Sequence, residues 1–210
     1  MTNELTPVPY NVTNIRDNHE NNINITGSTV NFHIQPPQNA NPSAAQDMIA
    51  VQRFSKEYYH LIVTTQEDAF RTNTILVLDS RCLIKGCVPD EIFNECSTLT
   101  EAGINKLLTF PAIVCMESKE PYGKPDPTQY ALYAYIKKIK KVGGAVAVVF
   151  QPLGAFPQDK LYDKRNSVFF DLNMNCYVSD LNHSSWSVHK VNVFEAFSEA
   201  GITHLPTPMI

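Results

Sequence analysis

Two apolar strings meet at a pair of glycines in the stretch DPTQYALYAYIKKIKKVGGAVAVVFQPL, residues 126 to 153. Asp126 as a cap, Pro127 at the first helical position and lysines toward the end favour a helix in the first string. Three tyrosines in that string, and Gly143-Gly144 between the two strings, favour a β-hairpin, because aromatic residues suit strands and two glycines suit a tight turn. The sequence leaves both structures open, and we take the hairpin as the prediction.

The segments on either side of this hairpin alternate between strand-like and helix-like patterns. Runs rich in β-branched residues predict strands at residues 58–65, 74–80, 111–118, 168–172 and 185–192. Capped apolar patterns predict helices at residues 43–58, 89–109 and 192–201. The polar residues 66–73, QEDAFRTN, indicate that the first two strands are joined as a long hairpin. The sum is one α+β domain over residues 43–210, with a mostly antiparallel, barrel-like sheet and peripheral helices.

The composition is that of an ordinary folded domain with a modest negative charge. Apolar residues make up 43% of the chain and the net charge is −4, so a core can form without metal or disulfide. The five cysteines form no CxxC pair, and no apolar run approaches the ~20 residues of a membrane span. MTNELTPVPY, residues 1–10, has no signal-peptide pattern, so we expect a cytoplasmic protein. We interpret the densest basic cluster as a solvated surface rather than a nucleic-acid contact: Lys137, Lys138, Lys140 and Lys141.

The first 42 residues form a unit of different composition. Asparagine is frequent there and prolines close the segment; asparagine favours turns over helix. Inside it, residues 21–35, NNINITGSTVNFHIQ, alternate apolar and polar positions on both sides of Gly27-Ser28. Because Gly27 can take the positive φ of a type II′ turn, the pattern predicts a two-stranded β-hairpin. Its apolar face consists of Ile23, Ile25, Val30, Phe32 and Ile34.

A lone hairpin is marginally stable in water, so this apolar face needs a cover. The hairpin can dock on its own domain, add to the sheet edge of another copy, or stack into a cross-β array. Its repeating Asn and Ile/Val spacing resembles the β-forming motifs of signalling amyloids over this short stretch. Each cover makes the leader an interaction element, and we call residues 21–35 the N-terminal arm.

A Pro-Asp pair followed by an ExK sequence at a predicted strand end resembles the PD-(D/E)xK nuclease pattern. The resemblance implies that Asp90 and Glu117 hold Mg²⁺ while Lys119 assists the attacking water. It also implies a helix that carries Gln129 and Tyr133 as an accessory pair. We rank the nuclease second, because Pro-Asp is ordinary helix-start chemistry and the accessory helix conflicts with the predicted hairpin.

Six short stretches carry a further likeness. They are YYHLIV (58–63), KGCVPDEI (85–92), FPAIVCMES (110–118), YGKPD (122–126), FPQ (156–158) and LNHSSWSVHKVNVFEAF (181–197). With them, residues 58–201 resemble a family of small bacterial proteins that carry an Asn/Thr-rich, β-prone leader and to which no activity is attached. The resemblance implies a strand pair over residues 130–151 and a position matching Lys119 that is not reliably basic, which weakens the nuclease hypothesis. It marks Asn182 and His183 as the polar residues of a candidate site.

Together these patterns predict a non-enzymatic, cytoplasmic binding or assembly protein that needs no cofactor. We expect the N-terminal arm to mediate self-association or docking to a protein partner, and we expect neither nucleic acid nor a membrane as partner. The first alternative is the nuclease of the PD-(D/E)xK type, with Mg²⁺ as its cofactor. The second is a small-ligand sensor with a pocket near Tyr130, Tyr133 and Tyr135.

Overall fold

The computed structural model describes residues 42–118, 126, 128–174 and 179–209. The N-terminal arm and Lys119 lie outside these residues, so the hairpin at 21–35 stays a prediction. No helix in the described part of the chain is long and apolar enough to cross a membrane. Six strands of this part form a single sheet: β1 (Tyr59–Thr64), β2 (Thr74–Leu78), β3 (Pro111–Met116), β4 (Tyr130–Val142), β5 (Ala145–Pro157) and β6 (Ser185–His189).

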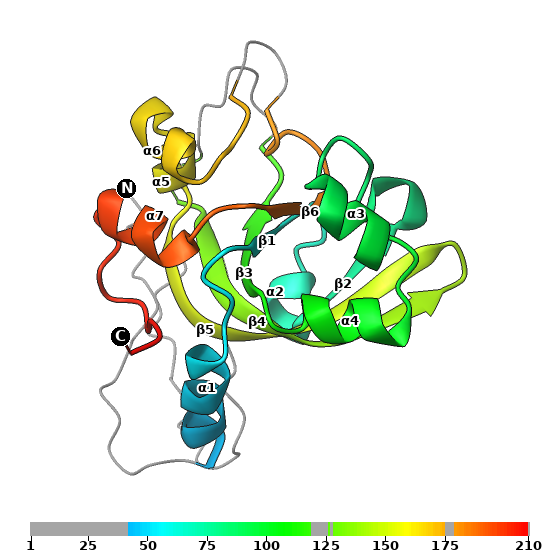
Figure 1. Cartoon of the computed structure of the whole chain (residues 1–210). Helices are drawn as coiled ribbons and strands as arrows, with labels where there is room; N and C mark the ends of the chain where they lie inside the picture. The colour runs from blue at the N-terminus through cyan, green and yellow to red at the C-terminus, as the bar shows by residue number, and fades with distance from the viewer. Residues whose placement is uncertain (1–41, 119–125, 127, 175–178, 210) are drawn as a thin grey trace, which may run out of the picture.

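Short helices connect these strands and cover the sheet. They are α1 (Pro42–Gln52), α2 (Ala69–Thr72), the 3-10 turn η1 (Asp79–Arg81), α3 (Asp90–Cys96), α4 (Glu101–Leu107), α5 (Asp159–Tyr162), α6 (Lys164–Phe169) and α7 (Val193–Glu199). Helices α2, α3 and α4 lie on one side of the sheet, and α1, α5, α6 and α7 lie on the other (Figure 1). The predicted α+β class is therefore confirmed.

The sheet has the strand order β2-β5-β4-β3-β1-β6. β1 and β3 run parallel, and the other neighbours are antiparallel, as predicted. The hairpin predicted for residues 126–153 is also confirmed, since β4 and β5 pair across Gly143 and Gly144. Their φ angles are +50° and +80°. Two successive positive φ angles belong to a type I′ turn, so the glycines decide this stretch in favour of strands.

Each face of the sheet has its own buried core. Successive residues of β1 alternate between the two: Ile62 packs into the core under α3 and α4, whereas Leu61 and Val63 pack into the core under α1 and α7. Alternation of this kind follows from the two-residue period of a strand. All six residues of β1 are buried, which explains why its sequence shows a continuous apolar run rather than a polar face.

The sheet is open, so the predicted barrel-like closure is wrong. β2 and β6 are its two edges. After Leu78 the chain turns into η1, and from there one bridge at Cys82 reaches Trp186 of β6. The amide of Leu83 donates to the carbonyl of Trp186 over 2.8 Å. A strand of five residues thus ends before it can pair along β6 and close a barrel.

Two further strand assignments are wrong. Residues 66–73 do not join a hairpin, because β1 and β2 are not neighbours in the sheet and α2 lies between them in the chain. Residues 168–172 continue α6 and turn at Asp171, which has a φ of +53°. The side chain of Asp163 caps α6 by accepting from the amide of Arg165 over 2.8 Å. Local capping therefore outweighs the strand propensity of these aromatic and branched residues.

A buried histidine of β1 ties the sheet to α4. The Nδ1 atom of His60 accepts a hydrogen bond from Trp186 Nε1 over 3.0 Å, and its Nε2 donates to the carbonyl of Leu107 over 2.9 Å. The indole N–H can only donate, so the arrangement requires a neutral ring with its proton on Nε2. Because His60 is fully buried, its pKa falls to about 4.

We expect the unfolding free energy to decrease as pH falls from about 6.5 to about 4, since the unfolded chain takes up a proton on His60 that the folded chain excludes. The loss from this residue is up to about 3 kcal/mol and is complete below pH 4. Urea unfolding followed by fluorescence of Trp186, the single tryptophan, measures it. His60→Gln, which cannot titrate, should show a flatter pH profile, and parallel profiles for the two proteins would contradict the assignment.

Candidate functional site

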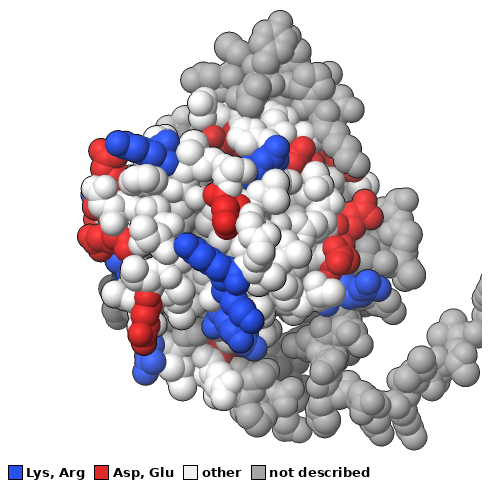
Figure 2. Space-filling view, turned by 90° about the vertical axis from the view of Figure 1, so that its right-hand side faces the viewer, with Lys and Arg blue, Asp and Glu red and all other residues white. Residues whose placement is uncertain are grey.

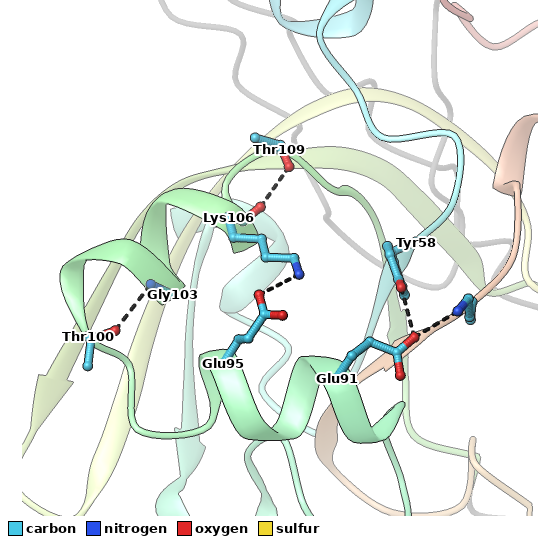
Figure 3. Close-up of polar contacts among 8 residues, drawn as sticks. Tyr58, Glu91, Glu95, Thr100, Gly103, Lys106 and Thr109 are labelled. Atoms are coloured by element: carbon cyan, nitrogen blue, oxygen red, sulfur yellow. Dashed lines mark hydrogen bonds and ion pairs between the residues drawn. The ribbon is translucent and has the colours of Figure 1, made fainter.

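Asp90 lies at the start of α3, near the end of the sheet where β1 begins. Its neighbour Glu91 accepts hydrogen bonds from the hydroxyl of Tyr58 over 2.9 Å (Figure 3) and from Lys190 Nζ over 2.8 Å. The Lys190 hydrogen bond is the main reason why the pKa of Glu91 falls to about 2. Tyr58 directly precedes β1 and Lys190 directly follows β6. The start of α3 is thereby fixed to this end of the sheet.

Glu117 directly follows β3 and lies beside the last residue of β1, at the opposite end of β1 from Asp90. Its amide donates to the carbonyl of Thr64, the last residue of β1, over 2.9 Å, and its carboxylate accepts from Ser184 Oγ over 2.8 Å. The six residues of β1 span roughly 20 Å, and this length separates Glu117 from the contacts of Glu91 with Tyr58 and Lys190. Two carboxylates that share one Mg²⁺ each lie about 2 Å from the ion. Asp90 and Glu117 are therefore not brought together as a metal site.

The other parts of the nuclease pattern do not complete a site. Tyr133 lies in strand β4, so the accessory helix does not exist. In the described ranges no group of three or more His, Cys, Asp or Glu residues could hold a metal ion. Burial raises the pKa of the Cys82 and Cys115 thiols to about 12, so neither supplies a ready thiolate nucleophile.

Asn182 holds a turn against the end of β3. Its Oδ1 accepts from the amide and the hydroxyl of Ser179, both over 2.8 Å, and its Nδ2 donates to the carbonyl of Ser118 over 3.1 Å. The adjacent His183 is exposed. Asn182 thus has a clear structural task, while a binding role for the Asn182-His183 pair stays a prediction.

A serine, a histidine and an aspartate form a line between β6 and the end of α6. Ser187 Oγ lies 3.0 Å from His189 Nε2, and His189 Nδ1 lies 3.0 Å from the backbone carbonyl of Asp171 and 3.7 Å from its carboxylate. Nδ1 must donate to that carbonyl, so Nε2 accepts from the serine. The polar interaction of the nearby His189 ring with the Asp171 carboxylate lowers the pKa of Asp171. The order of groups resembles a hydrolase triad, which the sequence does not reveal because no GxSxG sequence surrounds Ser187.

The surroundings of Ser187 do not support nucleophilic catalysis. Ser187 lies in the middle of β6 opposite Leu61, so the backbone beside it belongs to the β1–β6 ladder. An oxyanion hole needs free N–H groups aimed at the reacting carbonyl. Ser187 and His189 are both buried, and the ring of Tyr59 stacks on His189 at 5.2 Å. We interpret the line as a polar contact that fixes α6 against the sheet edge.

Two of the three tyrosines of β4 have surroundings that the described residues define. Tyr133 is fully buried and its hydroxyl has no hydrogen-bond partner among the described protein atoms. The hydroxyl of Tyr135 donates to Asp47 Oδ1 of α1 over 3.1 Å. A hollow of about 410 Å³ between α1 and β4 is lined by Ala50, Arg53, Phe54, Leu108, Thr109, Tyr135, Ile136 and Lys137. Of the three tyrosines, Tyr135 lines this hollow, and the small-ligand pocket near Tyr130, Tyr133 and Tyr135 stays a prediction.

One part of the sheet has a core on one face and bare apolar residues on the other. Beyond Tyr135, the far halves of β4 and β5 continue together with β2. On the side of α3 and α4 they bury Ile75, Val77, Ile139, Val146 and Val148. Residues on the opposite side belong to neither core. We call this side the uncovered face; it consists of Leu76, Leu78, Val142, Ala145, Ala147 and Val149, with Lys138 and Lys140 along its β4 border.

The uncovered face is apolar and open to water. Leu76, Leu78 and Val142 are 51%, 57% and 48% exposed. Figure 2 shows the side to which the β4–β5 turn points, where a band of basic side chains crosses a largely uncharged surface. Single exposed apolar residues are ordinary, but neighbouring ones on adjacent strands indicate an interaction surface. This is the feature of the described domain that best fits a binding role.

The two edge strands of the sheet, β2 at this face and β6 at the far end, are already occupied in part. Gln66 Nε2 donates to the carbonyl of Leu76 over 2.7 Å, and the amide of Leu76 donates back to Gln66 Oε1 over 3.1 Å. The side-chain amide thus makes the two bonds that an added strand would make at the middle of β2. At the other edge, Leu83 bonds to Trp186 of β6. Pairing at the middle of β2 and at Trp186 of β6 is therefore obstructed. β4 beyond Tyr135 pairs with no described strand on its β3 side, and lysines at 137, 138, 140 and 141 lie along it; lysine on an edge disfavours the addition of another strand.

The sequence gives only a weak signal for the uncovered face. Residues 74–78, TILVL, are apolar at nearly every position, so alternation cannot distinguish the buried Ile75 from the exposed Leu76. The stronger signal is KKIKK at 137–141, where lysines flank the buried Ile139. Charged residues on both sides of a strand residue indicate that the opposite face meets water.

No protein-family model, curated protein or solved structure matches this chain. The resemblance to a family of small bacterial proteins therefore stays a prediction. The function has to be argued from the geometry of the described residues.

Gln66 and Gln158 each make two side-chain hydrogen bonds to the backbone of one strand residue, Gln66 at the exposed edge of β2 and Gln158 in the interior. Gln158 makes the same pair of bonds to Met116, with Nε2 to the carbonyl at 2.8 Å and the amide to Oε1 at 3.0 Å, but is fully buried. We expect Gln158→Ala to lower the unfolding free energy by about 2 kcal/mol, because water cannot replace these bonds. Gln66→Ala should cost less than about 0.5 kcal/mol and accelerate hydrogen exchange at Leu76. Equal costs in urea unfolding would contradict the distinction.

Proposed function

We propose that the protein is a non-enzymatic, cytoplasmic binding or assembly protein whose N-terminal arm, residues 21–35, mediates self-association or docking to a protein partner. The observation that carries the proposal is the uncovered face, an apolar sheet surface that no helix or core of the described residues covers. A soluble domain rarely leaves contiguous apolar surface without a binding role. The arm offers a second apolar face of the same kind on the same chain.

The arrangement of the polar residues supports a binding role over catalysis. The two acidic residues of the nuclease pattern lie at opposite ends of β1. The serine nearest to a histidine base lies inside a strand ladder. The uncovered face is an accessible apolar surface of the described domain, and burial of apolar surface supplies binding affinity but no catalytic group.

Sedimentation velocity over a range of concentrations tests the proposal with two matched variants of the full chain. Ile23→Asp with Phe32→Asp places charges on the apolar face of the arm, and Asn24→Asp with Asn31→Asp places the same charges on its other face. We expect the first variant to lose self-association, because a charge cannot be buried in an apolar contact. The second variant should keep it.

A chain without residues 1–41 should behave as the first variant does. The truncated chain retains the described elements and both cores, since the buried residues run from Val51 to Leu205. If wild type, both variants and the truncated chain have the same mass at every concentration, the arm has no role in assembly and the proposal fails.

A further inference from the structure

We infer that the uncovered face is the docking surface for the arm of the same chain, and that this contact holds the arm back from assembly. The inference rests on the proposed function of the arm. It adds that the arm binds to the uncovered face of its own domain. Self-association then requires release of the arm from Leu76, Leu78 and their neighbours on β5.

The two surfaces match in chemistry and in period. The arm has apolar residues at every second position on one face, and the uncovered face has apolar residues at every second position of β2 and β5. Five residues of an extended strand span about 17 Å in either element. Two sheets stacked face to face lie about 10 Å apart and interdigitate such side chains. The hairpin can therefore lie on the three-stranded extension as a small second layer.

The surroundings of the sheet edges favour this face over an edge. On its β3 side, β4 beyond Tyr135 has no described neighbour, but lysines at 137, 138, 140 and 141 lie along it and disfavour strand addition. Addition of a strand to β2 would have to displace Gln66 from the backbone of Leu76, and addition to β6 would meet Leu83 at Trp186. Face-to-face packing needs neither displacement. It also covers the side chains that are exposed, whereas edge pairing would leave Leu76 and Leu78 in water.

The arm is joined to α1, which lies on the same side of the sheet as the uncovered face. Asp47 of α1 bonds to Tyr135, which pairs with Gln151, and Ala147 at the centre of the uncovered face lies four residues further along β5. This is about 13 Å along the strand, plus about 8 Å from Asp47 to the start of α1. The path also includes the Asp47–Tyr135 side-chain contact and the step of about 5 Å between the paired residues Tyr135 and Gln151. The six residues 36–41 reach about 20 Å when extended, and one strand of the arm covers about 17 Å more, so the arm can reach its own domain.

A tethered arm has a large advantage over the arm of another copy. A short linker gives an effective concentration in the millimolar range, far above the concentration of a second copy in dilute solution. When only a fraction of the arms is free, the apparent dissociation constant for self-association rises by the reciprocal of that fraction. Docking and assembly therefore compete for one apolar face of the arm.

Two full-length double variants test the inference. Leu76→Lys with Leu78→Lys places charge on the uncovered face at positions that are exposed, so the domain still folds. Val168→Lys with Met209→Lys is the control, because both residues are exposed apolar residues outside the uncovered face, with 73% and 75% exposure. Hydrogen exchange of residues 21–35 is measured below the concentration of self-association, and sedimentation velocity measures the association itself.

We expect residues 21–35 to exchange about tenfold faster in the Leu76/Leu78 variant than in the wild type, as release of a docked ribbon requires. The dissociation constant for self-association should fall by a similar factor per arm, and the control variant should match the wild type in both measurements. Weaker association in the Leu76/Leu78 variant would overturn the inference, because the face would then receive the arm of a second copy.

Unchanged exchange and unchanged association in the Leu76/Leu78 variant would also overturn the inference. The proposed function is judged separately by the arm variants: if Ile23→Asp with Phe32→Asp abolishes assembly while the Leu76/Leu78 variant has no effect, the arm acts as proposed but docks elsewhere. If the arm variant has no effect on mass, the proposed function itself fails.

Discussion

The two-residue turn at Gly143-Gly144 holds β4 and β5 in register as strands of thirteen residues each. Their neighbours are much shorter, with six residues in β3 and five in β2. The hairpin therefore extends beyond the part of the sheet that the helices cover on both sides. One face of this extension completes the core under α3 and α4, and the other face has no partner among the described elements.

Because this extension of the sheet is covered on one face only, the candidate site is a surface rather than a pocket. Two polar side chains inside the domain make structural contacts: His60 lies between Trp186 and Leu107, and Asn182 lies between Ser179 and Ser118. Such buried polar groups must be hydrogen-bonded to be tolerated. Once they are assigned, the unexplained feature of the described surface is the row of exposed leucines on β2.

The sequence determines some of these features and leaves others open, for physical reasons. The glycine pair reveals the β4–β5 hairpin because only a primed turn needs two positive φ angles at that place. The strand predicted at residues 168–172 is wrong, because their strand propensity is outweighed by the N-cap that Asp163 provides for α6. The distance between Asp90 and Glu117 cannot be read from the chain, since it depends on which end of β1 each residue meets. The exposure of Leu76 depends on which part of the sheet the helices cover, which no local pattern encodes.

The central claim is that the apolar face of the arm covers the uncovered face of its own domain. Methyl NMR of the full chain, at a concentration where it is monomeric, tests this most directly, because nuclear Overhauser contacts require methyl groups within about 5 Å, close to van der Waals contact. The account predicts contacts between the methyl groups of Ile23, Ile25 or Val30 and those of Leu76 or Leu78. Arm methyl groups with random-coil shifts and no contact to β2 or β5 would contradict it.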